Sequence, residues 1–168
     1  MAADLVNTRG WISGKERLTS VEDARAFLDA HGQHRRVTKA DLAKLLDLRS
    51  RLREIFLAGD DALTRRRINA LLAAFPTRPQ LAGDEPGVTF EPTVSDATSW
   101  IGAQAALGLA FFIARHGTNR LGICDASDCA DAYVDGSKNS NKRYCSSGCA
   151  RLESVRAFRE RKRKADSA

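Results

Sequence analysis

The sequence predicts a mainly α-helical protein, with an N-terminal helical bundle, a small β-hairpin, a small module built around four cysteines, and a basic C-terminal helix. Three observations support this fold class. Apolar residues recur at helical spacing through most of the first 117 residues, glycine and proline gather in residues 76–92, and all four cysteines lie between Cys124 and Cys149. We therefore divide the chain into residues 1–119, residues 120–164 and a short tail at residues 165–168.

Four helices are expected in the first part of the chain. Ser20 and Thr38 are each followed three residues later by aspartate, as in a capping box, and apolar stripes then run to Gly32 and Gly59. A third pattern occupies residues 60–76 and begins with two aspartates, which suit the positive end of a helix dipole. The fourth, residues 95–117, is apolar nearly all round, which is typical of the buried centre of a bundle.

A short β-hairpin is expected between Pro76 and Pro92. Prolines and glycines break helices there, and Val88 and Phe90 alternate with polar neighbours.

Positive charge is concentrated near the C-terminus. The chain has 27 Lys and Arg, 21 Asp and Glu and a net charge of +6. Residues 136–164 contain ten of these cations and two glutamates, so the rest of the chain carries a small net negative charge. A localised basic patch indicates a polyanionic partner more strongly than a high overall pI does.

The compartment bears on how the cysteines are interpreted. No secretory signal is visible in the first residues, and residues 100–114, the most apolar stretch, fall short of the ~20 residues that a membrane span needs. We therefore expect a cytoplasmic protein with no membrane partner. Thiols stay reduced in the cytoplasm, so clustered cysteines indicate metal ligands before disulfides.

The cysteine spacing predicts a zinc site. Four residues separate Cys124 from Cys129, fifteen separate Cys129 from Cys145, and three separate Cys145 from Cys149. Two close pairs joined by a loop of turn-forming residues can surround a tetrahedral Zn²⁺. Four protein ligands leave no position for a catalytic water, so one structural Zn²⁺ is expected. The alternatives are iron–sulfur ligation by the same thiolates, and cysteines that are buried hydrophobic residues or redox thiols without a metal.

The basic segment supplies candidate nucleic-acid contacts. After Cys149, Leu152, Val155 and Phe158 give an apolar edge near the cysteine module, and Arg156, Arg159 and Arg163 share one side of the helix. A zinc module leading into a basic helix is a common way to bring cations to DNA. The alternative is a solvated tail without a partner. The predicted contact residues are Lys138, Lys142, Arg143, Arg151, Arg156, Arg159 and Arg163.

The N-terminal part offers one weak candidate for a ligand pocket. Asn7, Thr8 and Arg9 follow an apolar entry, and Asn7 and Arg9 could line a pocket. Such residues more often cap a helix or tie down a terminus. No phosphate-binding loop, dinucleotide fingerprint, HExxH or nucleophile motif is present, so we do not expect an enzyme.

Several short motifs resemble those of the CGNR zinc-finger proteins of bacteria. They are the Cys124–Cys129 pair, the Asp135-Gly-Ser137 turn, the Arg143-Tyr-Cys145-Ser sequence, and Cys149 with the following Arg156-Ala-Phe-Arg159. The opening Asp4-Leu-Val-Asn7-Thr8-Arg9 is similar to the start of the ABATE domain, which usually precedes that finger. One departure is that Cys149-Ala-Arg-Leu152 lacks the glycine, asparagine and arginine that name the family.

The resemblance implies a bacterial transcriptional regulator that binds DNA through the zinc finger and basic helix. The helical domain would then dimerise or sense a small-molecule effector, and a homodimer is expected because one finger reads little sequence. The alternatives are a zinc-stabilised protein-interaction module, whose tail binds an acidic partner, and an RNA-binding protein. Few aromatic residues are available for base stacking in the finger, which counts mildly against RNA.

Overall fold

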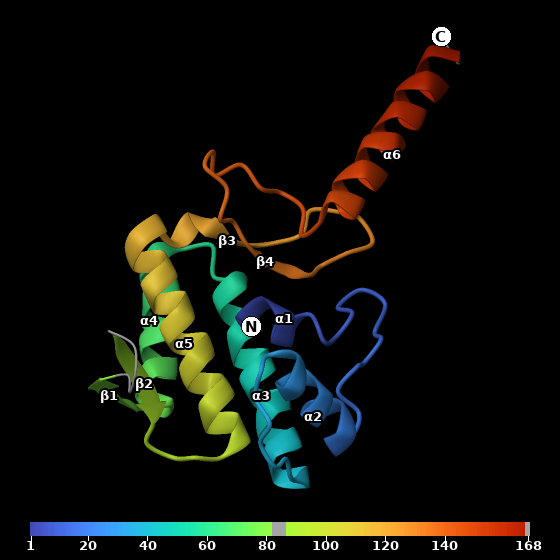
Figure 1. Ribbon diagram of the computed structural model, residues 1–168. Helices are drawn as coiled ribbons and strands as arrows, with labels where there is room; N and C mark the ends of the chain where they lie inside the picture. The colour runs from blue at the N-terminus through green and yellow to red at the C-terminus, as the bar shows by residue number, and fades with distance from the viewer. Residues whose placement is uncertain (82–86, 167–168) are drawn as a thin grey trace.

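The computed structural model describes residues 1–81 and 87–166, and it has the predicted mainly α fold (Figure 1). The elements in chain order are α1 (Ala2–Val6), α2 (Val21–Ala30), α3 (Lys39–Phe56), α4 (Asp61–Ala74), β1 (Thr77–Leu81), β2 (Val88–Pro92), α5 (Ala97–His116), the 3₁₀ turn η1 (Thr118–Arg120), β3 (Leu121–Ile123), β4 (Ala132–Val134) and α6 (Ser147–Asp166). The long helices α3, α4 and α5 pack against one another, while α6 projects away from them (Figure 1).

The predicted capping boxes set the starts of α2 and α3. The Ser20 hydroxyl accepts a hydrogen bond from the Asp23 backbone N–H at 3.1 Å, and the Asp23 carboxylate accepts one from the Ser20 N–H at 2.9 Å. Thr38 and Asp41 form the same reciprocal pair at 3.2 and 2.8 Å. Each box satisfies backbone donors that the first turn of a helix leaves without partners.

The core of the bundle follows the apolar stripe of α3. Leu45, Leu48, Leu52 and Ile55 recur every three or four residues, and each is at most 1% exposed. Full burial of such a side chain stabilises the fold by about 1.5–3 kcal/mol before entropy is counted. This spacing brings α1, α2, α4 and α5 around one face of α3.

Helix α5 is the apolar helix expected at the centre of the bundle. Its 20 residues, with mean hydropathy 1.5 in the most apolar window, could cross a membrane by length and composition alone, yet half of that window is buried inside the protein. Gly102 lets α5 approach the end of α4, because a Cβ there would lie 2.5 Å from the ring of Phe75. Gly117, with φ +87°, ends the helix as predicted.

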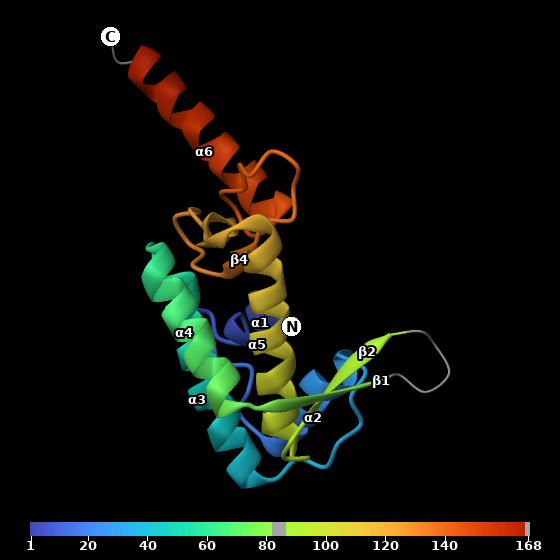
Figure 2. The same cartoon turned by 90° about the vertical axis from the view of Figure 1, so that its left-hand side faces the viewer.

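The expected hairpin is present as β1 and β2. The strands pair antiparallel, with Thr77 opposite Pro92 and Leu81 opposite Val88. The predicted turn between them falls on residues 82–86, which lie outside the described residues. β2 lies against α5 (Figure 2). The ring centres of Phe90 on β2 and Phe111 on α5 are 5.9 Å apart.

The second hairpin, β3 and β4, is part of the same hydrophobic core as the helices. Ala132 is 2% exposed, and Leu121, Ile123 and Val134 pack against the buried residues of the bundle. The domain boundary predicted between residues 119 and 120 therefore falls at η1, in the middle of a continuous core. Part of the cysteine module is built onto the bundle, because the apolar residues of its two strands pack into the core of the bundle.

A half-buried ion pair fixes the loop between α1 and α2. The Arg49 guanidinium, whose side chain is 5% exposed, donates to both carboxylate oxygens of Glu16 at 2.6 and 2.7 Å and to the Thr8 hydroxyl at 3.0 Å. The hydrogen bond from Arg49 lowers the pKa of Glu16 to about 2. Nearby, the Arg53 guanidinium lies 3.8 Å from the centre of the Trp11 ring. Periodicity gave no signal for these contacts.

Candidate zinc centre and nucleic-acid interface

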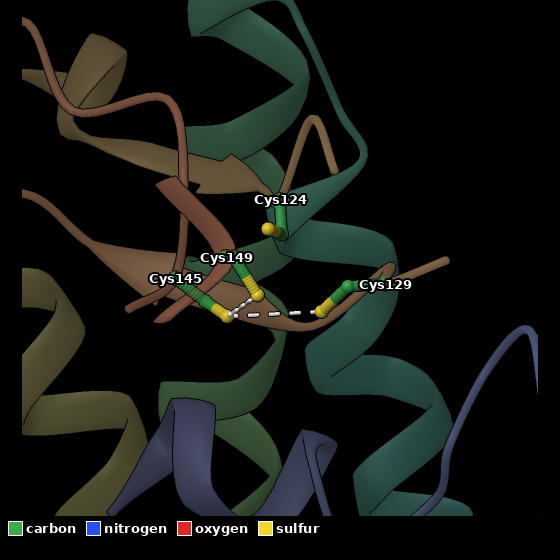
Figure 3. Close-up of side chains that lie close together, drawn as sticks. All are labelled: Cys124, Cys129, Cys145 and Cys149. Carbon is green, nitrogen blue, oxygen red and sulfur yellow. Dashed lines mark hydrogen bonds between the residues drawn. The ribbon is translucent and has the colours of Figure 1, made fainter. Parts of the chain in front are cut away.

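The four cysteine sulfur atoms form a cluster with the dimensions of a zinc site. All four Sγ atoms lie within 4.8 Å of one another, and Cys145 Sγ is 3.7 Å from the sulfurs of both Cys129 and Cys149 (Figure 3). A regular tetrahedron with Zn–S bonds of ~2.3 Å has sulfur–sulfur edges of ~3.8 Å. The cysteines therefore fit one Zn²⁺, as their spacing predicted, and fill its coordination sphere, so the ion is structural.

The first ligand pair is carried by the turn that follows β3. The Cys124 N–H donates to the Asp131 carbonyl at 2.8 Å, and the Cys129 N–H donates to the Ala126 carbonyl at 3.0 Å. These backbone bonds curl the chain so that both sulfurs point inward (Figure 3).

The second ligand pair lies at the start of α6. The Ser146 hydroxyl accepts a hydrogen bond from the Cys149 N–H at 3.2 Å, so Ser146 caps the helix that carries the last ligand. The hydrogen bond from Ser146 lowers the pKa of the Cys149 thiol. The positive end of α6 also favours thiolates at this position.

Burial acts in the opposite direction on the pKa values of two other ligands, Cys129 and Cys145. It raises the pKa of the Cys145 thiol to about 11 and raises that of Cys129 further. Without metal these two thiols are protonated at neutral pH, so Zn²⁺ must displace their protons on binding.

The loop between the two ligand pairs is organised by Asp135. Its buried carboxylate accepts hydrogen bonds from the Ser137 N–H at 2.8 Å and the Lys142 N–H at 3.0 Å. Hydrogen bonding to the Ser137 side chain first, and then to the Lys142 N–H, lowers its pKa to about 2. The Tyr133 hydroxyl donates to the Lys142 carbonyl at 2.7 Å, and its ring lies against Gly122. The Asp-Gly-Ser sequence could have predicted the Ser137 bond as a turn, but the bond to Lys142 depends on the return of the chain.

Arg156 fixes the direction of α6 against the first cysteine turn. Its guanidinium donates to the Asp128 carboxylate at 2.9 Å, to the Glu153 carboxylate at 2.5 Å and to the Ser127 hydroxyl. The carboxylates of Asp128 and Glu153 raise its pKa. Arg156 pairs with Glu153, three residues earlier on α6, because that side of the helix faces the cysteine turn.

The remaining predicted contact residues are exposed on α6 and the preceding loop. Arg151, Arg159 and Arg163 lie on α6, which has no buried residue, and Lys138, Lys142 and Arg143 lie on the loop. Arg143 is paired with Asp125 at 3.0 Å. A groove of about 410 Å³ at the start of α6 is lined by residues 141–147 and Ala150, including Lys142 and Arg143.

Helical spacing gives α6 a mixed basic and apolar face. Arg151, Val155, Arg159 and Lys162 follow one another at intervals of four, four and three residues and therefore share a face. Arg159 lies at the edge of this face, next to the side that Arg156 and Arg163 occupy. Leu152, Val155 and Phe158 are between 41% and 61% exposed along it.

The residues suggested for an N-terminal pocket have contacts within the protein. The Asn7 amide donates to the Ala132 carbonyl at 2.9 Å and accepts from the Ala132 N–H at 2.7 Å, so it ties α1 to β4. The Arg9 guanidinium lies 5.2 Å from the centre of the Trp11 ring. The alternative to a pocket was that this segment ties down the N-terminus. Asn7 does so, because it holds α1 against β4.

The fold and the site together define a zinc-finger protein whose finger is built onto a helical domain. Residues 1–135 match the model of the ABATE family, described as "Putative stress-induced transcription regulator", and residues 120–162 match that of the CGNR zinc finger. The chain belongs to the ABATE family and carries a CGNR zinc finger, which confirms the resemblance. No curated protein shows significant similarity to it.

The two matches overlap in residues 120–135, the segment that contains β3 and β4. The residues that replace the glycine, asparagine and arginine of the family motif, Ala150 to Leu152, lie in the first turns of α6. Leu152 is 49% exposed.

Proposed function

We propose that this protein is a bacterial, cytoplasmic transcriptional regulator that binds double-stranded DNA through α6 and the zinc finger, and that it is not an enzyme. The observation that carries the proposal is the position of α6. The helix begins at the zinc ligands, is fixed by Arg156, and then extends beyond the bundle with cations along an exposed face. A rigid helix presented in this way fits the major groove, with flanking cations at phosphates.

The charges along α6 have distinct expected roles. Arg151, Arg159 and Lys162 share an exposed face and are the proposed phosphate or base contacts. Arg156 is proposed to position the helix, because its guanidinium already donates hydrogen bonds to the carboxylates of Asp128 and Glu153. Lys138, Lys142 and Arg143 would meet the neighbouring phosphates, and Arg163 extends the basic end of the helix.

The proposal is tested by duplex DNA binding as a function of salt, measured by fluorescence anisotropy. Replacing Arg151, Arg159 and Lys162 with alanine should lower the affinity and reduce the slope of log K against log salt by about 2–3. The matched control replaces the exposed Arg25, Arg65 and Arg66 on α2 and α4 with alanine, which removes the same charge elsewhere. Equal losses in both variants, or no loss in either, would overturn the proposal.

One observation favours a second candidate function, an acidic protein partner for α6. Leu152, Val155 and Phe158 leave an exposed apolar edge beside the cations, and an amphipathic acidic helix would match both features. This candidate predicts only weak, salt-screened association with DNA. RNA remains the third candidate, with Phe158 as the exposed aromatic residue on α6 for base stacking.

Regulation by dimerisation or by an effector is also proposed. A single finger contacts few base pairs, so specific binding would need two copies arranged on a two-fold DNA site. Sedimentation with and without DNA measures this directly.

A further inference from the structure

A pocket of about 340 Å³ lies where α1, α5 and β4 meet. Its walls include Ala3 from α1, Leu109 and Phe112 from α5, and Val134 from β4. Gly108 contributes an open stretch of wall, because a Cβ placed there would meet no atom within 4 Å. The volume is within the ~300–1,000 Å³ range of small-molecule sites, and the lining is mainly apolar, as such sites usually are.

Few polar groups line the pocket, and one of them has no partner. The half-buried Gln104 side chain makes no hydrogen bond with any residue in the described part of the chain. Asp4 also lines the pocket, and its carboxylate lies 3.2 Å from the His31 ring. Met1 lines the pocket too, and its terminal ammonium lies 2.6 Å from the Asp4 carboxylate. Because that ammonium is already paired and the lining contains no Lys or Arg, an anionic ligand meets the Asp4 carboxylate and no unpaired cation there.

We propose that this pocket is a binding site for a neutral, mainly apolar small molecule that carries one hydroxyl, carbonyl or amide group. The apolar body would rest on Leu109, Phe112 and Val134, and the polar group would hydrogen-bond to the Gln104 amide. An amide both donates and accepts, so it suits each of these groups.

A ligand in this pocket would act on the zinc finger. Val134 is the last residue of β4, and α1 is tied to the same strand through the two Asn7–Ala132 hydrogen bonds. A molecule that contacts α1, α5 and β4 together stabilises the docking of the β3–β4 hairpin on the bundle. Cys124 directly follows β3, so occupancy of the pocket should slow the loss of zinc. This inference does not depend on whether α6 binds DNA.

The direct test uses 4-fluorobenzyl alcohol as the probe and the broadening of its ¹⁹F signal by the full-length zinc protein. Gly108→Leu fills the pocket and should abolish the broadening. Ala114→Leu places the same side chain at an exposed position on the same helix and should retain it. 4-Fluorobenzoate should not bind. Equal broadening with both variants, tighter binding of the benzoate, or no broadening of the alcohol would each overturn the proposal.

Two further measurements keep the test decisive if Gly108→Leu fails to fold. Gln104→Leu keeps the apolar walls and removes the amide, so it should lose the preference for the alcohol over fluorobenzene. Zinc transfer to a coloured chelator should be slowed by the alcohol more than by fluorobenzene in the wild type, and equally by the two probes in Gln104→Leu. An unchanged preference, or zinc release that is insensitive to the probe in the wild type, contradicts the assignment.

Discussion

The side chain of Asn7 makes two hydrogen bonds with the backbone of Ala132, 125 residues further along the chain. Its Nδ2 donates to the Ala132 carbonyl at 2.9 Å, and its Oδ1 accepts from the Ala132 N–H at 2.7 Å. Ala132 is 2% exposed, so water has little access to replace these bonds. The amide therefore acts as the edge partner that β4 lacks on this side, and it joins the first helix to the zinc finger.

Asn7→Ala should destabilise the protein by about 1–3 kcal/mol, because it leaves a buried donor and a buried acceptor without partners. The measurement is urea unfolding of the zinc-loaded protein. Asn69→Ala, at an exposed position on α4, is the matched control and should change little. Equal stability of the Asn7 variant and the wild type would show that the tether contributes nothing.

Zinc affinity should fall steeply as the pH is lowered. Burial raises the pKa of Cys129 and that of Cys145, the latter to about 11, so both thiols hold protons in the metal-free protein at neutral pH. Binding displaces at least these two protons, so the apparent association constant should drop about 100-fold per pH unit. Chelator competition at several pH values near neutrality measures the slope. A pH-independent affinity would exclude thiolate ligation by these two residues.

Stability in mild acid should depend on Glu16. Its folded pKa of about 2 is below the usual value of 4.5, so its contribution is complete above pH 4.5 and is lost as the pH falls toward 2. Glu16→Gln should remove about 2 kcal/mol at neutral pH and flatten the acid dependence. Urea unfolding across this pH range is the measurement.

The control for Glu16 is Glu54→Gln. Glu54 pairs with Arg67 at the surface, where its side chain is 57% exposed, so the substitution should change stability by less than about 1 kcal/mol. If Glu16→Gln and Glu54→Gln lower the free energy of unfolding equally, the burial of Arg49 does not make the Glu16–Arg49 pair stronger than the exposed Glu54–Arg67 pair.

Arg156→Ala and Arg159→Ala should weaken DNA binding in different ways. Arg156 holds Asp128 and Glu153, so its loss should loosen α6 and lower the affinity while the salt slope stays nearly constant. Arg159 is exposed and is proposed to meet a phosphate, so its loss should reduce the slope by about one. Salt titrations of the two variants separate these roles. A unit change in slope for Arg156→Ala would make it a direct contact.

The sequence by itself determined the five long helices, α2 to α6, and the zinc ligands. Capping at Ser20 and Thr38 involves residues three apart, and the apolar stripe of α3 follows from the helical repeat. The cysteine pairs lie close in the chain and their chemistry constrains the geometry, so spacing alone predicted the cluster that contains Cys124 and Cys149. These features are local, and local patterns can be read without a fold.

Only the tertiary structure decided how these parts are joined. The Asn7–Ala132 bonds, the Glu16–Arg49 pair and the Arg156–Asp128 pair each connect residues far apart in the sequence. The sequence showed that these polar side chains exist but could not show which groups they meet, because hydrogen bonds over long separations form only after the elements pack. For the same reason, the core shared by bundle and finger and the pocket at α1, α5 and β4 were visible only in the fold.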